Sequence, residues 1–188
     1  MASTADIRNG MMIRFNHDIF QIVEFLHVKP GKGAAFVRTK LKSVTNGKVL
    51  DNTFPSGAKL EEVRVEHRTY QYLYPDGDQY VFQDLENWEQ VNVDKHLINA
   101  PEFLDDGMEC EVIVNADEEK VLGVEVPSFV VLEVTYTEPG LKGDTATNTL
   151  KPATCGPNSV EVKVPLFVDT GEKIRIDTRT RSYMERVK

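Results

Sequence analysis

A lysine between two glycines is the most informative short pattern in this chain of 188 residues. The segment VKPGKGAAFVRTKLKS runs from Val28 to Ser43, and within it Gly31 and Gly33 flank Lys32, with Pro30 just before them. Proline fixes its own φ and glycine adopts backbone angles closed to other residues, so the pattern predicts a tight turn. The amine of Lys32 would project from its apex, where it can meet an anion such as a phosphate.

Basic residues surround this turn. No acidic residue lies between Glu24 and Asp51, and the basic residues of that interval are Lys29, Lys32, Arg38, Lys40, Lys42 and Lys48. Alternation after the turn predicts a strand with Phe36, Arg38, Lys40 and Lys42 on one face and Val37, Thr39 and Leu41 on the other. Such a positive face suits a nucleic-acid backbone. It is also typical of a solvated strand edge that prevents aggregation, and both interpretations stay open.

Other kinds of site do not match the residue spacing. The turn is not a P-loop, because GxxxxGK[ST] is not met, and an exposed apex gives no pocket for a Schiff-base lysine. Metal-ligand spacing is missing among the histidines, which are His17, His27, His67 and His96. Neither Cys110 nor Cys155 has a CxxC or histidine partner, so two reduced thiols are expected. We expect no catalytic residue, no metal and no cofactor.

Charge divides the chain into three parts. Residues 1–64 hold 10 basic and 6 acidic residues, residues 65–129 hold 3 and 16, and residues 130–188 hold 9 and 8. The net charges are therefore +4, −13 and +1, and together they give the −8 of the whole chain. Because salt screens charges beyond about 10 Å, the local values matter more than the total. The first part can meet a polyanion, whereas the second should repel one and is expected to face solvent or a basic protein.

Short alternating runs separated by turn residues predict an all-β protein. We expect three small β-barrel domains in series, with boundaries at 1–64, 65–129 and 130–188. In the first, Asn46-Gly47 predicts a two-residue hairpin turn. In the second, VNVDKHLINAPEFLDDG (91–107) is the best helix candidate, interrupted at Pro101. No apolar run approaches the roughly 18 residues of a membrane helix, and the start lacks signal-peptide features, so a cytoplasmic location is expected.

Several motifs resemble bacterial elongation factor P, in order and along the full chain. They are VKPGKGAAFVRTKLKS, YQYLYPDGDQY, EPGLKGDTA, KPAT, VKVPLFV, IRIDTRT and YMERVK. The resemblance implies an SH3-like (KOW-type) N-terminal domain followed by two OB-fold domains. The archaeal and eukaryotic five-A initiation factors are similar in their first two domains but lack the third.

The resemblance also implies a function, which is not enzymatic. Members of this family bind the 70S ribosome between the peptidyl and exit sites when it stalls on consecutive prolines. The lysine loop then points at the CCA end of peptidyl-tRNA. Lys32 takes the loop-tip position, which a lysine-modifying enzyme extends in many relatives. Pro30, Gly31 and Gly33 would shape the loop.

Further contacts are implied on the same grounds. Lys29, Arg38, Lys40 and Lys42 would grip the tRNA backbone. In the loop GLKGDTATNT, residues Gly143, Asp144 and Thr145 match the family's contact with messenger RNA in the exit site, although the loop is also a plausible plain hairpin turn. Tyr183 and Arg186 match positions that contact the ribosome, and an aromatic with an arginine suits RNA. Inward packing of Tyr183 is the equal alternative.

Two other functions stay open beside a monomeric translation factor. One is the family's three-domain paralogue, although a loop without KPGKG would be expected there. The other is a general RNA-binding or RNA-chaperone protein that does not distinguish ribosomes carrying peptidyl-tRNA from other RNA. An enzyme is disfavoured because the residues form no nucleophile–base pair, no metal cluster and no nucleotide loop.

Overall fold

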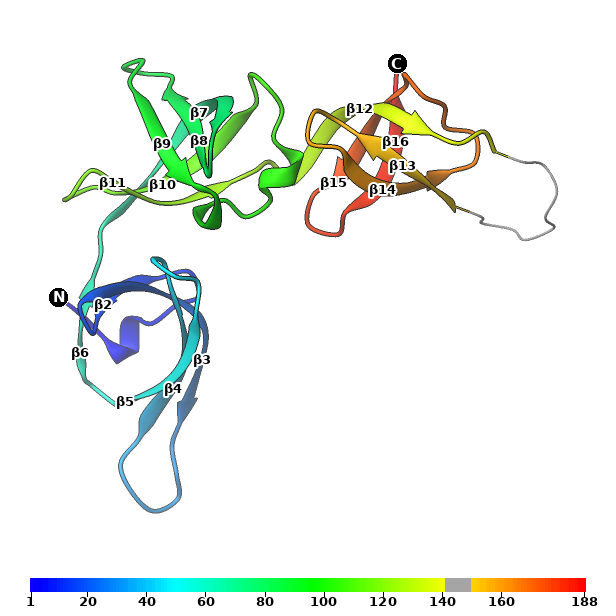
Figure 1. Ribbon diagram of the computed structural model, residues 1–188. Helices are drawn as coiled ribbons and strands as arrows, with labels where there is room; N and C mark the ends of the chain where they lie inside the picture. Colours follow the sequence, from blue (N-terminus) through cyan, green and yellow to red (C-terminus); the bar gives the residue numbers. More distant parts are fainter. Residues whose placement is uncertain (141–149) are drawn as a thin grey trace. The chain divides into compact units, whose positions relative to one another are not determined.

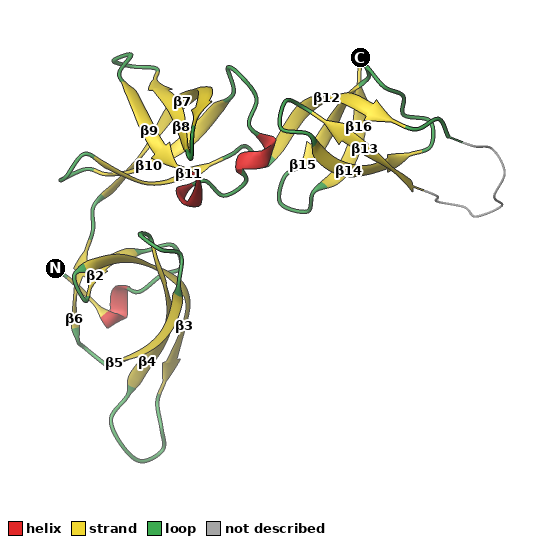
Figure 2. Cartoon of the chain, viewed as in Figure 1, coloured by secondary structure: helices red, strands yellow, loops and turns green. Residues whose placement is uncertain are grey.

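The structure, a computed structural model, describes residues 1–140 and 150–188 (Figure 1). Across these residues the chain is built of β-strands and three short 3-10 helices, with no α-helix (Figure 2). The predicted all-β class is confirmed, and the strands form curled sheets, as small β-barrel domains require. None of the helices in this part of the chain is long or apolar enough to cross a membrane.

Six strands form the first sheet, in the order β1-β6-β2-β3-β4-β5. They are β1 (Ala2–Ser3), β2 (Met12–Phe15), β3 (Asp18–Val28), β4 (Phe36–Ser43), β5 (Val49–Pro55) and β6 (Lys59–Glu62). The 3-10 helix Thr4–Asp6 follows β1 and is capped by Ser3, whose hydroxyl accepts a hydrogen bond from Ala5 N. The sheet is strongly curled (Figure 1), and an apolar cluster packs against it.

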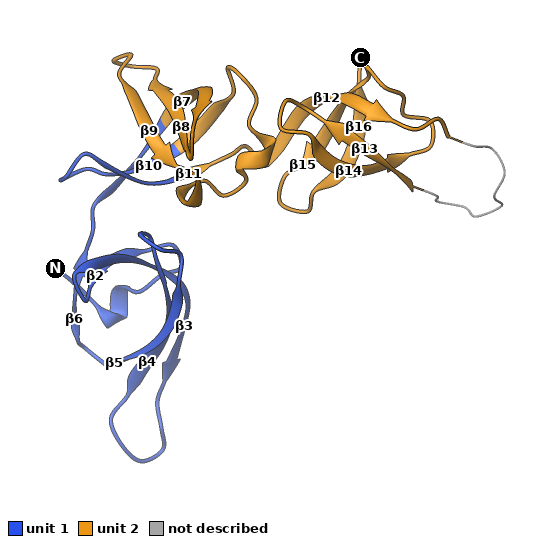
Figure 3. Ribbon diagram, in the orientation of Figure 1, with its two compact units in different colours: residues 1–68, 112–123 blue, residues 69–111, 124–188 orange. Residues whose placement is uncertain are grey.

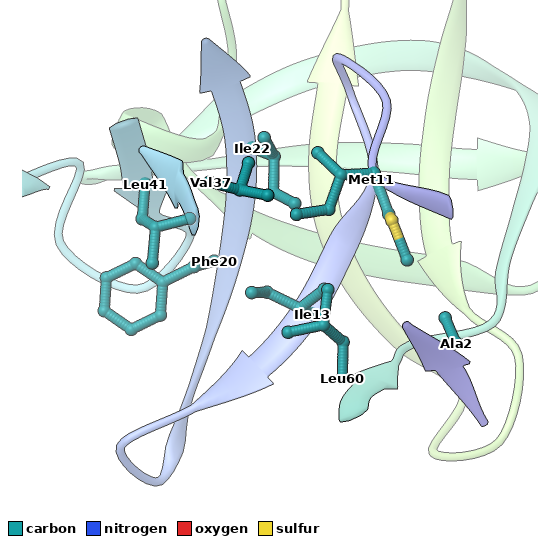
Figure 4. Close-up of a cluster of buried hydrophobic side chains, with 9 residues drawn as sticks. Ala2, Met11, Ile13, Phe20, Ile22, Val37, Leu41 and Leu60 are labelled. Carbon is teal, nitrogen blue, oxygen red and sulfur yellow. The ribbon is translucent and has the colours of Figure 1, made fainter. Parts of the chain in front are cut away.

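The core of the first sheet explains the alternation along β4. Val37, Thr39, Leu41 and Ser43 are buried, whereas the basic residues between them are exposed. Val37 and Leu41 join the buried cluster drawn in Figure 4, whose other labelled members are Ala2, Met11, Ile13, Phe20, Ile22 and Leu60. The predicted two faces of this strand are therefore confirmed, because a period of two places every second residue inside.

The connection between β4 and β5 differs from the predicted two-residue turn. It runs over residues 44–48, and only Gly47 of the Asn46-Gly47 pair has a positive φ, of 70°. Ser43 N donates to Lys48 O at 2.8 Å, and the side-chain oxygen of Asn46 accepts from Lys48 N at 2.9 Å. The asparagine thus acts through its side chain, which closes a longer loop than the dipeptide alone suggests.

Asp18, the first residue of β3, ties that strand to the β4–β5 loop. Its carboxylate accepts hydrogen bonds from Ser43 Oγ at 2.6 Å, Thr45 Oγ1 at 2.5 Å and Ile19 N at 2.8 Å. Partial burial alone would raise the pKa of Asp18, but the three hydrogen bonds outweigh it and the pKa lies below the ordinary value of 3.8. The charged form of Asp18 therefore stabilises the fold.

Asp18→Asn is expected to lower the free energy of unfolding at pH 7 by roughly 1 kcal/mol, since hydrogen bonds to a half-exposed charged group are lost. Because the folded pKa is depressed, the contribution of Asp18 is fully present above pH 4 and is lost as the pH falls through the folded value. Denaturant unfolding measures the free energy of unfolding between pH 3 and pH 7. This free energy should depend less on pH for the variant than for the wild-type protein. Asp51→Asn on the exposed face of β5 is the control, and an equal flattening there would contradict the assignment.

Five strands form the second sheet, in the order β11-β10-β7-β8-β9. They are β7 (Val65–Asp76), β8 (Gln79–Asp84), β9 (Gln90–Asp94), β10 (Glu109–Asn115) and β11 (Lys120–Glu125). The helix predicted over 91–107 is wrong: the stretch starts within β9 and continues as two 3-10 turns, Lys95–Leu97 and Pro101–Phe103. Alternating valines suit a strand, and Pro101 leaves too short a run for a stable α-helix.

Five further strands form the third sheet, in the order β14-β13-β12-β15-β16. They are β12 (Phe129–Thr137), β13 (Leu150–Cys155), β14 (Val160–Pro165), β15 (Lys173–Asp177) and β16 (Ser182–Val187). Every second residue of β12 from Val130 to Val134 is buried. We propose that the three sheets correspond to the predicted domains 1–64, 65–129 and 130–188. Every strand lies within one of these ranges, except that β12 begins one residue early, at Phe129.

The chain divides into two compact units (Figure 3). One holds residues 1–68 and 112–123, and the other holds residues 69–111 and 124–188. In the first unit, a second apolar cluster joins Met12, Ile19 and Val63 to Ile113 and Leu122. This unit therefore combines the N-terminal sheet with a hairpin that follows it by some fifty residues in the sequence.

Candidate nucleic-acid interface

The lysine turn is the connection between β3 and β4. The two strands pair antiparallel as far as Val28 and Phe36, so the loop comprises residues 29–35 and Lys32 is its central residue. Residues 31–34 are exposed, and the backbone groups of residues 29–34 make no hydrogen bond to other described backbone groups. The loop is therefore wider than the predicted tight turn, but it presents Lys32 at its centre, away from acidic neighbours.

The two glycines of this loop have different roles. Gly33 has a φ of 113°, a conformation that L side chains rarely adopt, so a glycine is required there. Gly31 has no positive φ, and a Cβ placed on it would meet no atom within 4 Å. The backbone therefore requires a glycine at position 33 but not at position 31, and the loop-shaping role of both glycines stays a prediction.

The outer face of β4 carries the predicted basic residues. Arg38, Lys40 and Lys42 alternate with the buried residues of the strand, so their side chains share one exposed surface. Arg38 stacks over the ring of Phe36, with its Cζ 5.6 Å from the ring centroid. This contact holds one face of the guanidinium while its N–H groups stay available to an anion.

Lys40 is less available than its neighbours. Its Nζ donates to Glu24 on β3 at 2.8 Å, and Asp51 is its cross-strand partner on β5. The hydrogen bond and the charge of Glu24 raise the pKa of Lys40. Glu24 reaches this position because a register shift in β3 between Ile22 and Glu24 places it beside Lys40. Within the described part of the chain, Lys29, Lys32, Arg38 and Lys42 form no ion pair, so they carry the free positive charge of this hairpin.

The two other predicted surfaces are only partly described. Gly143, Asp144 and Thr145 lie outside the described residues. Tyr183 and Arg186 lie on β16, at the edge of the third sheet. Tyr183 is half-buried, which leaves its two interpretations open. Arg186 pairs with Glu172 at 3.1 Å and stacks 4.8 Å from the centroid of the Phe167 ring, so this exposed guanidinium is already held in place.

The structure divides the predicted site residues between its two units. The lysine hairpin belongs to the unit with residues 1–68, and Tyr183 and Arg186 belong to the other. Sequence reasoning missed Lys151 in the second unit, which is 7% exposed and donates to the carbonyl oxygen of Glu138 at 2.6 Å. This bond joins β13 to the residue that follows β12, and only its tertiary partner identifies it.

The acidic turn after β10 has a structural role. Glu118 accepts a hydrogen bond from Arg14, and Glu119 pairs with Arg68 at 2.8 Å. These contacts raise the pKa of Arg14 and lower the pKa of Glu119. Two acidic residues of the middle third therefore meet arginines of the same chain, which leaves fewer free carboxylates there to face a basic protein.

The cysteines have no reactive environment. Cys110 and Cys155 are buried and unpaired, and burial raises their pKa values to about 12 and about 11. A thiol with such a pKa is almost fully protonated at neutral pH, so it is a poor nucleophile. Over residues 1–140 and 150–188, no group of three acidic, histidine or cysteine side chains is arranged to hold a metal ion.

Comparison with known proteins assigns the whole chain to one family. Three family models match consecutive stretches: the elongation factor P KOW-like domain over residues 3–60, its OB domain over 65–124 and the elongation factor P C-terminal domain over 130–186. "Elongation factor P" of Flavobacterium psychrophilum is 57% identical over 188 residues, which is 100% of both chains. The chain belongs to the elongation factor P family.

Further relatives agree with this assignment. "Elongation factor P 1" of Porphyromonas gingivalis is 57% identical, and "Elongation factor P" of Bacteroides fragilis is 53% identical, each over the full length of both chains. A solved structure of "Eukaryotic translation initiation factor 5A from Methanococcus jannaschii" shares the fold, with a TM-score of 0.54 and 22% identity over 67% of this chain and 90% of that one. The family assignment supports the role of a translation elongation factor, and such factors are not typically enzymes.

Proposed function

We propose that this protein binds the ribosome between the peptidyl and exit sites and stimulates peptide-bond formation on stretches of consecutive prolines. It does so in the cytoplasm, by holding the CCA end of peptidyl-tRNA with the Lys32 loop. The observation that carries the proposal is the position of Lys32, exposed at the centre of a loop on the KOW-like domain of an elongation factor P family member. The third domain would reach messenger RNA and the small subunit.

The chemistry of the hairpin supports a contact with tRNA. Proline is a poor nucleophile in peptide transfer, so the geometry of the peptidyl end limits the rate. Holding the reacting groups in position can remove several kcal/mol from such a barrier, and every 1.4 kcal/mol or so is a tenfold change in rate. Lys29, Arg38 and Lys42 have free charges for phosphates, whereas the charge of Lys40 is shared with Glu24. An enzyme that lengthens Lys32 would extend its reach.

A reconstituted translation reaction without any elongation factor P tests this function. Protein purified from its own cells should speed synthesis of a reporter with three consecutive prolines and leave a proline-free reporter unchanged. The mass of the Lys32 peptide from the same sample shows whether the side chain is modified. Equal stimulation of both reporters, or binding to free RNA as tight as to ribosomes with peptidyl-tRNA, would favour a general RNA-binding protein.

A further inference from the structure

The loop between β8 and β9 presents the only tryptophan of the chain to solvent. Trp88 is 66% exposed, and it has no aromatic or cationic stacking partner among the described residues. Its φ is 65°, in the left-handed region that a bulky side chain rarely adopts. An indole in this position gains little from burial, so packing within the fold does not explain why the residue is a tryptophan.

Hydrogen bonds hold this loop in one shape. Trp88 N donates to Asp84 O at 3.0 Å, and Asp84 N donates to Glu89 O at 2.9 Å. The buried Asp84 carboxylate accepts from Glu86 N at 2.8 Å, and Gln83 Nε2 donates to the carbonyl oxygen of Trp88 at 3.2 Å. The indole is therefore presented on an ordered loop, which lowers the entropy lost when a partner binds.

The charge around the loop selects the partner. No basic residue lies between Arg68 and Lys95, and the acidic residues of that interval are Asp76, Asp78, Asp84, Glu86, Glu89 and Asp94. Glu86 and Glu89 flank Trp88 and form no ion pair in the described part of the chain. Such a surface repels phosphates, but it complements arginine and lysine, whose cations also stack on an indole face. Tryptophan is among the residues that most often dominate an interface.

We propose that the Trp88 loop, residues 85–89, docks on a lysine- and arginine-rich protein segment of the ribosome. The indole stacks against a cationic side chain, and Glu86 and Glu89 pair with further basic groups at the rim. This docking rests on the proposed ribosome binding and adds a protein contact to the RNA contacts of the Lys32 hairpin. The acidic second sheet thereby takes part in binding without approaching RNA.

Co-sedimentation of the full chain with 70S ribosomes tests the docking. Trp88→Ala should weaken binding by about tenfold, which corresponds to the loss of about 1.4 kcal/mol. Tyr74→Ala is the matched control, because Tyr74 is also an exposed aromatic residue of the same acidic stretch, at 51% exposure. Tyr74→Ala should bind ribosomes within about twofold of the wild-type affinity, because Tyr74 is not expected to anchor the interface. A photoreactive benzoylphenylalanine in place of Trp88 should cross-link to a ribosomal protein.

The outcomes separate the docking from the function. If the wild-type protein and Trp88→Ala bind ribosomes equally well, the docking is overturned and the proposed function stands. Cross-links to ribosomal RNA in place of protein would also overturn it. Wild-type protein that fails to sediment would overturn both. Weaker binding by Trp88→Ala but not by Tyr74→Ala, together with cross-links from position 88 to a ribosomal protein, would establish the Trp88 loop as a protein-binding surface.

Discussion

Lys32→Ala is expected to slow a reporter with three consecutive prolines by about tenfold or more relative to the wild-type protein, and to leave a proline-free reporter unchanged. The side chain is exposed at the centre of the β3–β4 loop and has no ion pair in the described residues, so its loss should not disturb the fold. What is lost is the amine at the loop tip that would hold the CCA end. Single-turnover translation assays with each reporter measure the effect.

Two further variants sharpen this result. Lys48→Ala removes the same charge from the exposed β4–β5 loop of the same sheet, and it should leave both reporters near wild-type rates. Lys32→Arg keeps the charge but removes the primary amine that a modifying enzyme would extend. Equal slowing by Lys32→Ala and Lys48→Ala would mean that only total charge matters, and equal effects on both reporters would contradict the proline-specific role.

Gly140→Ala is expected to cost about 1–3 kcal/mol of folding stability, as overpacking in a filled space does. An added Cβ would lie 2.5 Å from the carbonyl oxygen of Leu166 and 3.0 Å from its Cβ. Both obstacles are close to the backbone, so neither can swing aside as the end of a long side chain would. Equilibrium unfolding in urea, followed by tyrosine and tryptophan fluorescence, measures the loss.

Gly31→Ala is the matched control for this prediction. Gly31 also lies in a loop and has no positive φ, but a Cβ there would meet nothing within 4 Å. The same substitution should therefore change the stability by less than about 0.5 kcal/mol. A loss as large for Gly31→Ala as for Gly140→Ala would show that chain entropy, and not the close approach to Leu166, sets the cost.

The alternation of buried and exposed residues made the strands predictable. β4 is the clearest case, since its period of two places Val37 and Leu41 in the core and Arg38 and Lys42 outside, whatever the rest of the chain does. The exposure of Lys32 was predictable from a different local signal, because a proline and two glycines end the strand and start a loop. Local patterns failed over 91–107, where the 3-10 turns around Pro101 replace the expected helix.

The sequence by itself determined the all-β class, the lysine hairpin and, through long collinear motifs, the elongation factor P family. Only the tertiary structure decided which charges are free. Glu24 neutralises Lys40, and Glu118 meets Arg14 across 104 residues of sequence, because folding brings these side chains together. The close approach of Gly140 to Leu166 and the left-handed backbone of Trp88 are equally invisible in the sequence. Such contacts depend on where distant segments meet, and no local periodicity encodes that.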